Sequence, residues 1–262
     1  MATVYTPDTG AIALNGFGVK ENAEKVKEQI GISFQDPKYD RILTAREILD
    51  WHGKITGVSK EDRRRRMDEV LGKFGLQEES RKRTWMLSGG TKKKIENAKV
   101  FVQRPPVAVF DEPTAYLDVP SRLMVWDMIK ELREEGSTIL LATNMMDEAD
   151  RLSDRVGIMN QGTMVAVDTP LALKRSLVGR DAVEVQVESN PSQYLDEIKQ
   201  IDEVKDARVE GNVLHIYVNN GRVMLSHIIN KLSAKGAVIQ SVNLREPTLE
   251  DVFLHYTGSK LI

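Results

Sequence analysis

A serine–glycine–glycine turn in this chain has residue types that suit a phosphate group. Ser88, Gly89 and Gly90 follow Leu87 and precede a lysine-rich stretch with helical spacing. Glycines let backbone N–H groups approach a phosphate closely, and the N-terminus of the next helix would point its positive dipole toward it. Taken alone, this tetrapeptide is better explained as a serine helix cap after a flexible turn.

Acidic and amide side chains follow short apolar segments elsewhere in the chain. VAVF at 107–110 leads to Asp111 and Glu112, and IGISF at 30–34 leads to Gln35. Open parallel α/β sheets bind ligands at the carboxyl ends of their strands. One carboxylate could hold Mg²⁺, directly or through water, and the other could orient or deprotonate an attacking water. The acidic pair alone is not diagnostic, because apolar strands commonly end on acidic residues.

The elements that would position these residues alternate between strands and helices. Apolar runs predict strands at 30–34, 107–110 and 137–142, and the first and last of these are expected to be buried. Residues 44–100 are mostly helical in pattern, with a capping box at Thr44 and Glu47 and a cap at Ser59. The alternation predicts a parallel α/β sheet. Further expected elements are helices at 21–29, 121–135 and 146–153, and paired strands within 155–167.

The composition changes near Gly179, where a second pattern begins. Strands, helices and a hairpin follow in the order βαββαβ, which is the split-βαβ plan of ferredoxin-like domains. A terminal helix at 248–256 is expected to pack on the sheet through Leu249, Val252, Phe253 and Tyr256. The predicted domains are residues 1–178 and 179–262, with a helical subdomain at about 40–100.

Composition excludes several kinds of site. The 262 residues include no cysteine, so disulfides and thiolate metal sites are excluded. The formal net charge is −2, and no nucleic-acid binding is expected. The run Arg63–Arg66 is interpreted as a solvated helix face, because acidic residues flank it on both sides. The four histidines are scattered, without the spacing of a metal site.

The sequence also predicts how the chain would meet a membrane. Its opening residues, MATVYTPDTG, form neither the basic nor the apolar region of a secretory signal. No apolar run is long enough to span a bilayer. Any membrane role is therefore expected to come through a partner.

Taken in order, the motifs resemble those of the ATP-binding subunit of ABC transporters. Gln35 matches the Q-loop glutamine, 87–90 the signature, 107–112 the Walker B strand and 115–118, ending on Asp118, the D-loop. The tail PTLEDVFLHYTG at 247–258 resembles the accessory domain of drug-export ATPases of the daunorubicin-resistance and sodium-export branch. The resemblance implies an α/β P-loop-type ATPase core, N-terminally truncated and carrying a helical subdomain, plus a C-terminal α+β ferredoxin-like domain.

The resemblance also implies roles for these residues. Glu112 would activate water, Asp111 and Gln35 would face Mg²⁺, and Asn144 would stand at the switch position. Leu87, Ser88, Gly89 and Gly90, with Asp118 nearby, would close over ATP held by a partner. The implied cofactors are ATP and Mg²⁺. The implied partners are a membrane-spanning permease and a second ATP-binding subunit, identical or different, on the cytoplasmic face of the membrane.

The sequence departs from the family pattern at three places. It contains no G-x-x-x-x-G-K-[ST] phosphate loop, it has Asn144 where histidine is usual, and it has Tyr116 where the D-loop usually has glycine. An asparagine amide donates a hydrogen bond but carries no imidazolium charge. We therefore expect weak or absent ATP binding at the chain's own half-site. The alternatives are a non-enzymatic subunit that lends its signature to a competent partner ATPase, or a gene fragment.

Overall fold

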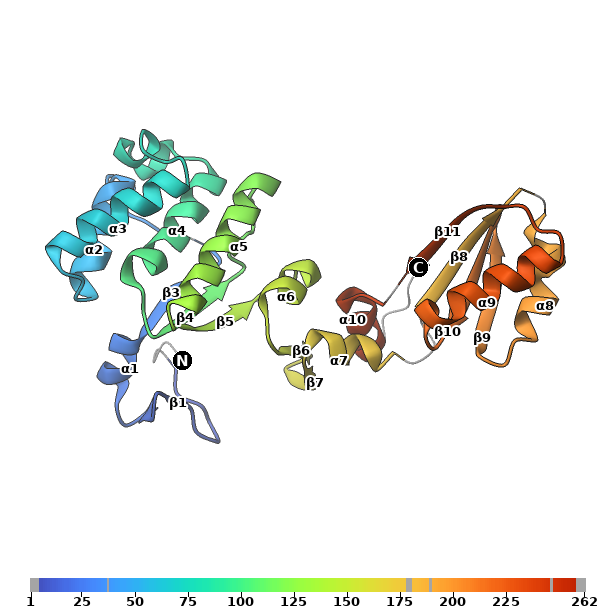
Figure 1. The fold of residues 1–262 in the computed structure, drawn as a ribbon. Helices are drawn as coiled ribbons and strands as arrows, with labels where there is room; N and C mark the ends of the chain where they lie inside the picture. Colours follow the sequence, from blue (N-terminus) through green and yellow to red (C-terminus); the bar gives the residue numbers. More distant parts are fainter. Residues whose placement is uncertain (1–4, 37, 178–180, 189, 246, 258–262) are drawn as a thin grey trace. The chain divides into compact units, whose positions relative to one another are not determined.

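The computed structural model describes residues 5–36, 38–177, 181–188, 190–245 and 247–257. The chain forms two compact units, Met1–Leu152 and Ser153–Ile262 (Figure 1). The predicted domain boundary at 178/179 lies outside the described residues and stays a prediction. Each unit is considered by itself below.

A parallel sheet organises the first unit. Its strands β3 (Ile30–Ser33), β4 (Val107–Asp111) and β5 (Thr138–Ala142) lie in the order β3-β4-β5. The β3–β4 ladder runs from the pair Ile30↔Val107 to the pair Ser33↔Phe110. All carboxyl ends therefore meet at one edge, and the predicted parallel α/β sheet is confirmed. Before it come the hairpin β1 (Ala13–Leu14) and β2 (Phe17–Gly18) and the helix α1 (Ala23–Gln29).

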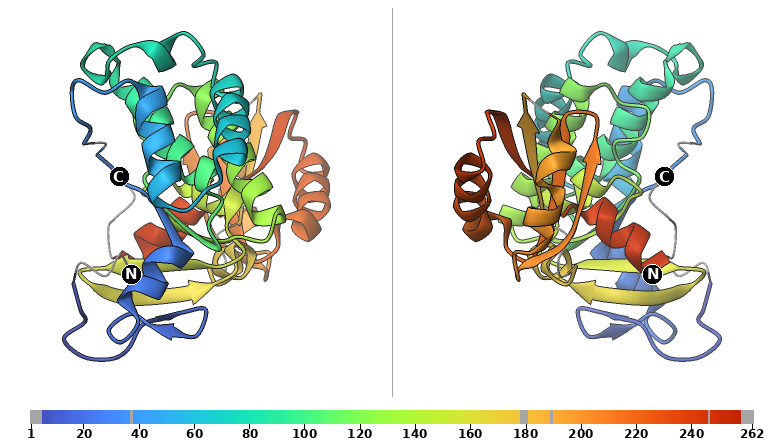
Figure 2. Two further views of the ribbon diagram at one scale, coloured as in Figure 1. Left: turned by 90° about the vertical axis from the view of Figure 1, so that its left-hand side faces the viewer. Right: turned by 90° about the vertical axis from the view of Figure 1, so that its right-hand side faces the viewer.

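Three packed helices stand between β3 and β4 in the chain. They are α2 (Ala45–Ile55), α3 (Lys60–Lys73) and α4 (Gly89–Gln103), with short 3₁₀ turns η1 (Glu79–Arg81) and η2 (Thr84–Met86) before α4. Both predicted caps are confirmed: Thr44 and Glu47 form a full capping box, and Ser59 accepts from the Asp62 N–H. Each helix packs on the other two, and α4 also packs on β3 (Figure 2).

The arginine run on α3 is not the solvated face that its flanking acids suggest. Arg63 is buried, with its Nε 2.6 Å from Asp50 Oδ1 of α2 and an Nη 3.0 Å from the Val58 carbonyl. Arg66 donates to the Val102 and Gln103 carbonyls at the end of α4. Only Arg64 and Arg65 of the run are exposed. Flanking charge could not show this, because Arg63 and Arg66 share one helix face that turns inward.

Strand β5 is more exposed than its apolar sequence predicts. It pairs with β4 along one edge, and Leu140 is 43% exposed. Ile139 and Leu141, on the other face, pack against the core. The prediction of a buried strand is therefore wrong for one face of β5. An apolar run shows that side chains favour burial, but it does not show whether other elements pack on both faces of the strand. Helices α5 (Val119–Glu134) and α6 (Met146–Leu152) flank β5 in the chain.

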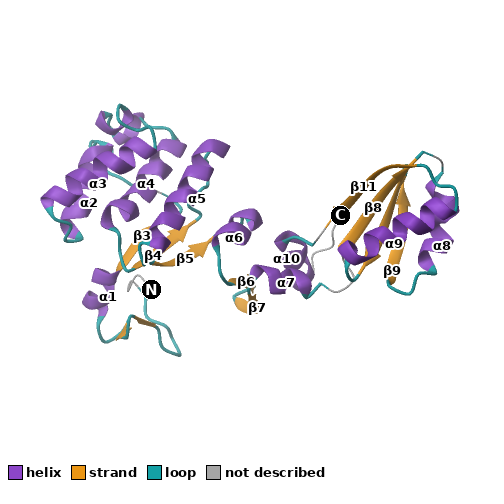
Figure 3. Cartoon of the chain, viewed as in Figure 1, coloured by secondary structure: helices purple, strands orange, loops and turns teal. Residues whose placement is uncertain are grey.

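The second unit is built on an antiparallel sheet. Strands β8 (Asp181–Val187), β9 (Val204–Glu210), β10 (Val213–Val218) and β11 (Ile239–Arg245) lie in the order β11-β8-β10-β9. The 3₁₀ turn η3 (Pro191–Tyr194), α8 (Leu195–Lys199) and α9 (Gly221–Ala234) connect them, in the predicted βαββαβ order (Figure 3). Residues buried between sheet and helices form one apolar cluster.

The terminal helix does not pack where the sequence predicts. α10 (Leu249–Thr257) makes its main contacts with α7 (Pro170–Arg175) and with β6 (Val156–Asn160), which pairs with β7 (Thr163–Asp168). Leu249 and Val252 are buried there, whereas Phe253 and Tyr256 are half-buried. The apolar stripe predicted burial correctly but not the surface that provides it. Among the described residues, no helix has the length and apolarity to cross a membrane.

Candidate functional site

Gln35 and Asp111 line the same pocket at the carboxyl edge of the parallel sheet. The pocket has a volume of 510 Å³, and its other lining residues are Phe34, Asp36, Lys38, Glu96 and Lys99. Gln35 follows β3 directly, and Asp111 is the last residue of β4. Parallel pairing of two strands that end together brings these side chains into one place. The structure thus brings together the two residues predicted to face Mg²⁺.

Glu112 and Asn144 meet beside this pocket. The backbone N–H of Asn144 donates to Glu112 Oε1 at 2.9 Å. The backbone N–H of Glu112 donates to the Ala142 carbonyl at the end of β5. Burial raises the pKa of the Glu112 carboxyl, with help from the charges of Glu148 and Asp111, while the Asn144 N–H opposes the rise. A carboxyl with a raised pKa is better suited to accept a proton than an ordinary surface glutamate. The two predicted catalytic residues are therefore neighbours.

A buried carboxylate fixes the loop behind Glu112. Glu148 on α6 is fully buried, and its Oε1 accepts from Thr114 Oγ1 and from Trp126 Nε1, each at 2.8 Å. Thr114 lies two residues after Glu112, and Trp126 lies on α5. Glu148 therefore ties the loop after β4 to α5 and α6.

The serine–glycine turn is the N-terminus of α4. Ser88 is the N-cap residue, and its Oγ accepts from the Thr91 N–H at 3.1 Å. Leu87 is buried and anchors the turn. Gly89 and Gly90 open the helix, so that their N–H groups lack partners within it and point outward. Ser88 is therefore a helix cap, as the tetrapeptide alone suggested. The N–H groups at the start of α4 can still bind an anion.

Gly90 packs against the loop that holds Tyr116 and Asp118. A Cβ at Gly90 would lie 3.1 Å from the Tyr116 carbonyl oxygen, so the close approach favours glycine. Asp118 caps α5 by accepting from the Ser121 N–H at 2.9 Å. Hydrogen bonds from the side chain and the backbone of Ser121 lower the pKa of the Asp118 carboxyl. The signature turn and the D-loop therefore lie side by side.

The sequence did not reveal the buried polar residues of α4. Lys93, Glu96 and Asn97 are all buried on the face that meets the sheet. The Phe34 N–H donates to Glu96 Oε1 at 3.1 Å, Tyr39 Oη and Lys99 Nζ also donate to Glu96, and burial raises the pKa of the Tyr39 hydroxyl. The i, i+3, i+4 spacing of these three polar residues places them on one helix face, and this spacing was the sequence signal that they lie together.

These polar residues connect α4 to the loops of the site. Asn97 accepts from Ser33 Oγ at 2.7 Å and donates to the Pro113 carbonyl at 2.8 Å. Lys93 Nζ donates to the carbonyl oxygens of Phe34, Gln35 and Asp111 at 2.7, 3.3 and 2.9 Å. Burial lowers the pKa of the Lys93 ammonium, and the carboxylates of Glu96, Asp111 and Glu112 oppose that shift. The helix that carries the signature is therefore bonded to the residues after β3 and β4.

The donor set fits a magnesium–nucleotide ligand on two counts. Gln35 and Asp111 offer amide and carboxylate oxygens to one pocket, and Mg²⁺ takes one or two protein oxygens together with waters and phosphates. The described residues contain no group of three or more acidic or histidine side chains that could cage a metal alone. The open N-terminus of α4, a 15-residue helix, fits a phosphate.

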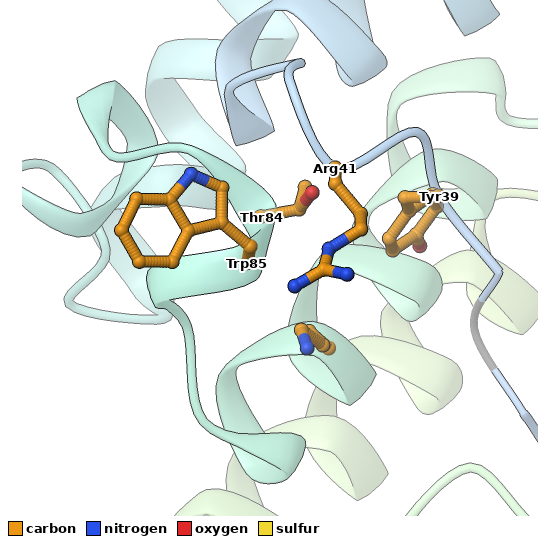
Figure 4. Close-up of a pocket in the computed structure, with 5 residues that line it drawn as sticks. Tyr39, Arg41, Thr84 and Trp85 are labelled. Carbon is orange, nitrogen blue, oxygen red and sulfur yellow. The ribbon is translucent and has the colours of Figure 1, made fainter.

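A second pocket lies between the segment after Gln35 and the helices. It has a volume of 290 Å³ and is lined by Tyr39, Arg41, Thr84, Trp85 and Lys92. In Figure 4 the Arg41 side chain lies between Trp85 and Tyr39. Trp85 is 56% exposed, which is unusual for so large an apolar side chain. The pocket therefore combines two cations with an accessible aromatic ring.

Family models match both parts of the chain. Residues 1–115 match the model described as ABC transporter. Residues 169–257 match the model described as ATP-binding protein DrrA1-3-like, C-terminal domain.

Curated relatives match almost the whole chain. The daunorubicin resistance ATP-binding protein DrrA2 of Streptomyces coeruleorubidus is 31% identical over 99% of this chain and 81% of its own length. The linearmycin resistance ATP-binding protein LnrL of Bacillus subtilis is 30% identical over 97% of this chain and 82% of its own length.

Solved structures match the fold. An ATP-binding subunit of an ABC transporter has a TM-score of 0.63 at 26% identity, covering 67% of this chain and 73% of that one. A dimeric ATP-binding cassette in a post-hydrolysis state, bound to ADP and phosphate, has a TM-score of 0.58 at 22% identity, covering 64% of this chain and 76% of that one. With the polar edge of the parallel sheet and the α4 turn described above, these matches show that the chain belongs to the ATP-binding proteins of ABC transporters, in the branch that contains the daunorubicin-resistance proteins.

Proposed function

We propose that this chain works as the ATP-binding subunit of an exporter and that its own polar edge takes part in hydrolysis. The observation that supports this most directly is the convergence of Gln35, Asp111, Glu112 and Asn144 at the carboxyl ends of three adjacent strands. Gln35 and Asp111 would hold Mg²⁺, which supplies positive charge to the phosphates. Glu112 would orient and deprotonate the attacking water through the carboxylate oxygen that Asn144 does not occupy.

The signature turn is proposed to act on a nucleotide held by a second subunit. Ser88 and the N–H groups of Gly89 and Gly90 would bind its terminal phosphate, because a helix N-terminus favours negative charge. Asp118, on the loop packed against Gly90, would help to place the turn. The dimeric cassette among the similar structures is consistent with such a pair, formed with an identical or a different subunit.

A second candidate is a subunit that lends its signature but does not hydrolyse ATP itself. Asn144 favours it, because a neutral amide gives a weaker hydrogen bond to a phosphate than an imidazolium would.

The membrane subunit is proposed to dock at the pocket shown in Figure 4. Arg41 and Lys92 would attract an acidic segment, and the ring of Trp85 would pack on an apolar side chain of that segment. The chain would then lie on the cytoplasmic face of the membrane. The exported compound would be a drug, a lipid-like compound or an ion, and the daunorubicin and linearmycin resistance proteins among the relatives favour a drug.

The second unit is proposed to be a ferredoxin-like accessory domain, within a division of the chain at 178/179. The strand order β11-β8-β10-β9 with two connecting helices on one apolar face supports this description. A regulatory or dimer-stabilising role is consistent with its compact core.

The test of the catalytic assignment is Glu112→Gln in the complex assembled with the permease and its partner ATPase. Glutamine keeps the shape and the hydrogen bond from Asn144 but cannot take a proton. ATP turnover should fall by about 10²-fold or more, the usual contribution of a general base. Glu134→Gln, an exposed position on α5, is the matched control and should turn over normally. Turnover at the control's rate would exclude Glu112 as the base and leave the second candidate.

A further inference from the structure

We propose that Lys93 is a positioning residue that holds Gln35 and Asp111 close enough together for both to face one Mg²⁺. The roles of Gln35 and Asp111 come from the proposed function, on which this inference rests. Lys93 itself would touch neither substrate nor metal. It lies behind the site, on the helix that begins with the signature.

The reason for such a residue lies in how the two strands end. The β3–β4 ladder stops at the pair Ser33↔Phe110. The next residues, Phe34, Gln35 and Asp111, have carbonyls that the ladder no longer reaches, and all three accept from Lys93 Nζ at 2.7–3.3 Å. Beyond the last backbone pair of the ladder, the Lys93 ammonium group therefore connects the residues after β3 to the end of β4 through a single nitrogen.

The burial of Lys93 makes this connection specific. Its residue exposure is 0%, so bulk water does not compete for the Lys93 ammonium group. Hydrogen bonds from a charged donor are stronger than neutral ones, and a buried charged donor left without acceptors is costly. Glu96 and Asn97, on the same face, bind Phe34 N–H, Ser33 and Pro113. They hold the flanking residues, whereas Lys93 holds the carbonyls of Gln35 and Asp111 themselves.

Lys93 also lies one helical turn after Gly89. A phosphate bound at the turn would therefore contact the same helix whose Lys93 binds the carbonyls of Gln35 and Asp111.

Hydrogen exchange on the purified chain tests the structural part. The Phe34 N–H is bonded to Glu96 and the Glu112 N–H to the Ala142 carbonyl, so both amides report local opening. Lys93→Met keeps the length of the side chain but removes the donor. Exchange at Phe34 and Glu112 should rise about tenfold, while amides of α2 and of the second unit keep their rates. Lys94→Met, on the more exposed side of the same helix, should change neither amide. Equal rates in the two variants would overturn the proposal.

Lys93→Arg decides the matter if the methionine variant does not fold. Arginine keeps the charge, but its planar donors cannot converge on three carbonyls around one atom. Faster exchange at Phe34 and Glu112 in a folded arginine variant supports the proposal, and wild-type exchange at both overturns it.

The dependence of ATP turnover on Mg²⁺ in the assembled complex separates positioning from simple stability. Lys93→Met should raise the Mg²⁺ concentration for half-maximal turnover severalfold, with turnover largely recovered at saturating Mg²⁺. A merely structural role would lower turnover at every Mg²⁺ concentration, and that result would overturn the proposal. If the wild-type complex itself shows no turnover, the proposed function fails, while the exchange experiment still judges Lys93.

Discussion

At the residue scale, the backbone of Tyr116 explains why its position is unusual. Tyr116 has φ of 65°, in the left-handed region that glycine adopts without strain. The family resemblance leads us to expect glycine here, and Tyr116 adopts a conformation that suits glycine although it carries a Cβ. The ring is 74% exposed and gains little from packing. Tyr116 is therefore a point of strain in the loop that touches the signature turn.

Replacing Tyr116 tests that strain. A left-handed conformation costs a residue with a Cβ about 1–2 kcal/mol, and glycine returns part of this through unfolded-state entropy. Tyr116→Gly should therefore be more stable than Tyr116→Ala by roughly 0.5–1 kcal/mol, measured by urea unfolding. Alanine is the matched control because both variants lose the ring. An alanine variant as stable as the glycine variant would show that the backbone of this loop is not strained.

At the element scale, His52 links the packing of α2 and α4 to pH. Its Nε2 lies 3.2 Å from Gln103 Oε1 at the end of α4. Burial lowers the pKa of His52 from 6.5 to about 4, and the charge of Lys99 contributes. The folded chain thus resists protonation that the unfolded chain accepts. The stability from neutral His52 is complete above about pH 6.5 and is lost as the pH falls from there to about 4.

His52→Gln should remove this pH dependence. Glutamine can still bond to Gln103 but does not titrate. Between pH 7 and pH 4 the wild type should lose on the order of 2–3 kcal/mol of unfolding free energy more than the variant. Denaturant unfolding at several pH values measures the difference. His227→Gln, at an exposed position on α9, should follow the wild type. Parallel curves for wild type and His52→Gln would refute the assignment.

The elements themselves were largely predictable, and their partners were not. The apolar runs at 30–34 and 107–110 became β3 and β4, and the Thr44 capping box formed as its spacing requires. Local pattern decides such features. The inward turn of Arg63, the three carbonyls around Lys93 and the exposed face of β5 depend on residues far away in the sequence. For the site, strand ends identified Gln35, Asp111 and Glu112, whereas the residues that hold them needed the fold.

At the scale of the whole molecule, each unit has an apolar core of its own. The large clusters of the first unit lie within residues 14–152, and that of the second lies within residues 183–237. The signature turn and the pocket at Trp85 both belong to the first unit, and they present different chemistry. The signature turn offers N–H groups, whereas the pocket at Trp85 offers cations and an aromatic ring.

Arg41→Glu tests the docking surface. Reversing the charge beside Trp85 should weaken binding to vesicles that contain the permease by about tenfold, since like charges repel at a complementary interface. Co-sedimentation at low and physiological salt measures it. Arg64→Glu makes the same change on the exposed side of α3 and should bind as the wild type does. Equal weakening by both variants would mean that general charge, and not this pocket, governs attachment.

The hydrogen bond between Trp126 and Glu148 has a practical consequence. Trp126 is 4% exposed and lies behind the Glu112 loop, whereas Trp85 lines the proposed docking pocket and Trp51 is exposed on α2. A buried indole emits at shorter wavelength than an exposed one. The three tryptophans of the chain therefore act as built-in optical reporters. A change at the blue side of the emission spectrum would report on the loop after β4, and quenching at the red side would report on occupation of the proposed docking pocket, without any label.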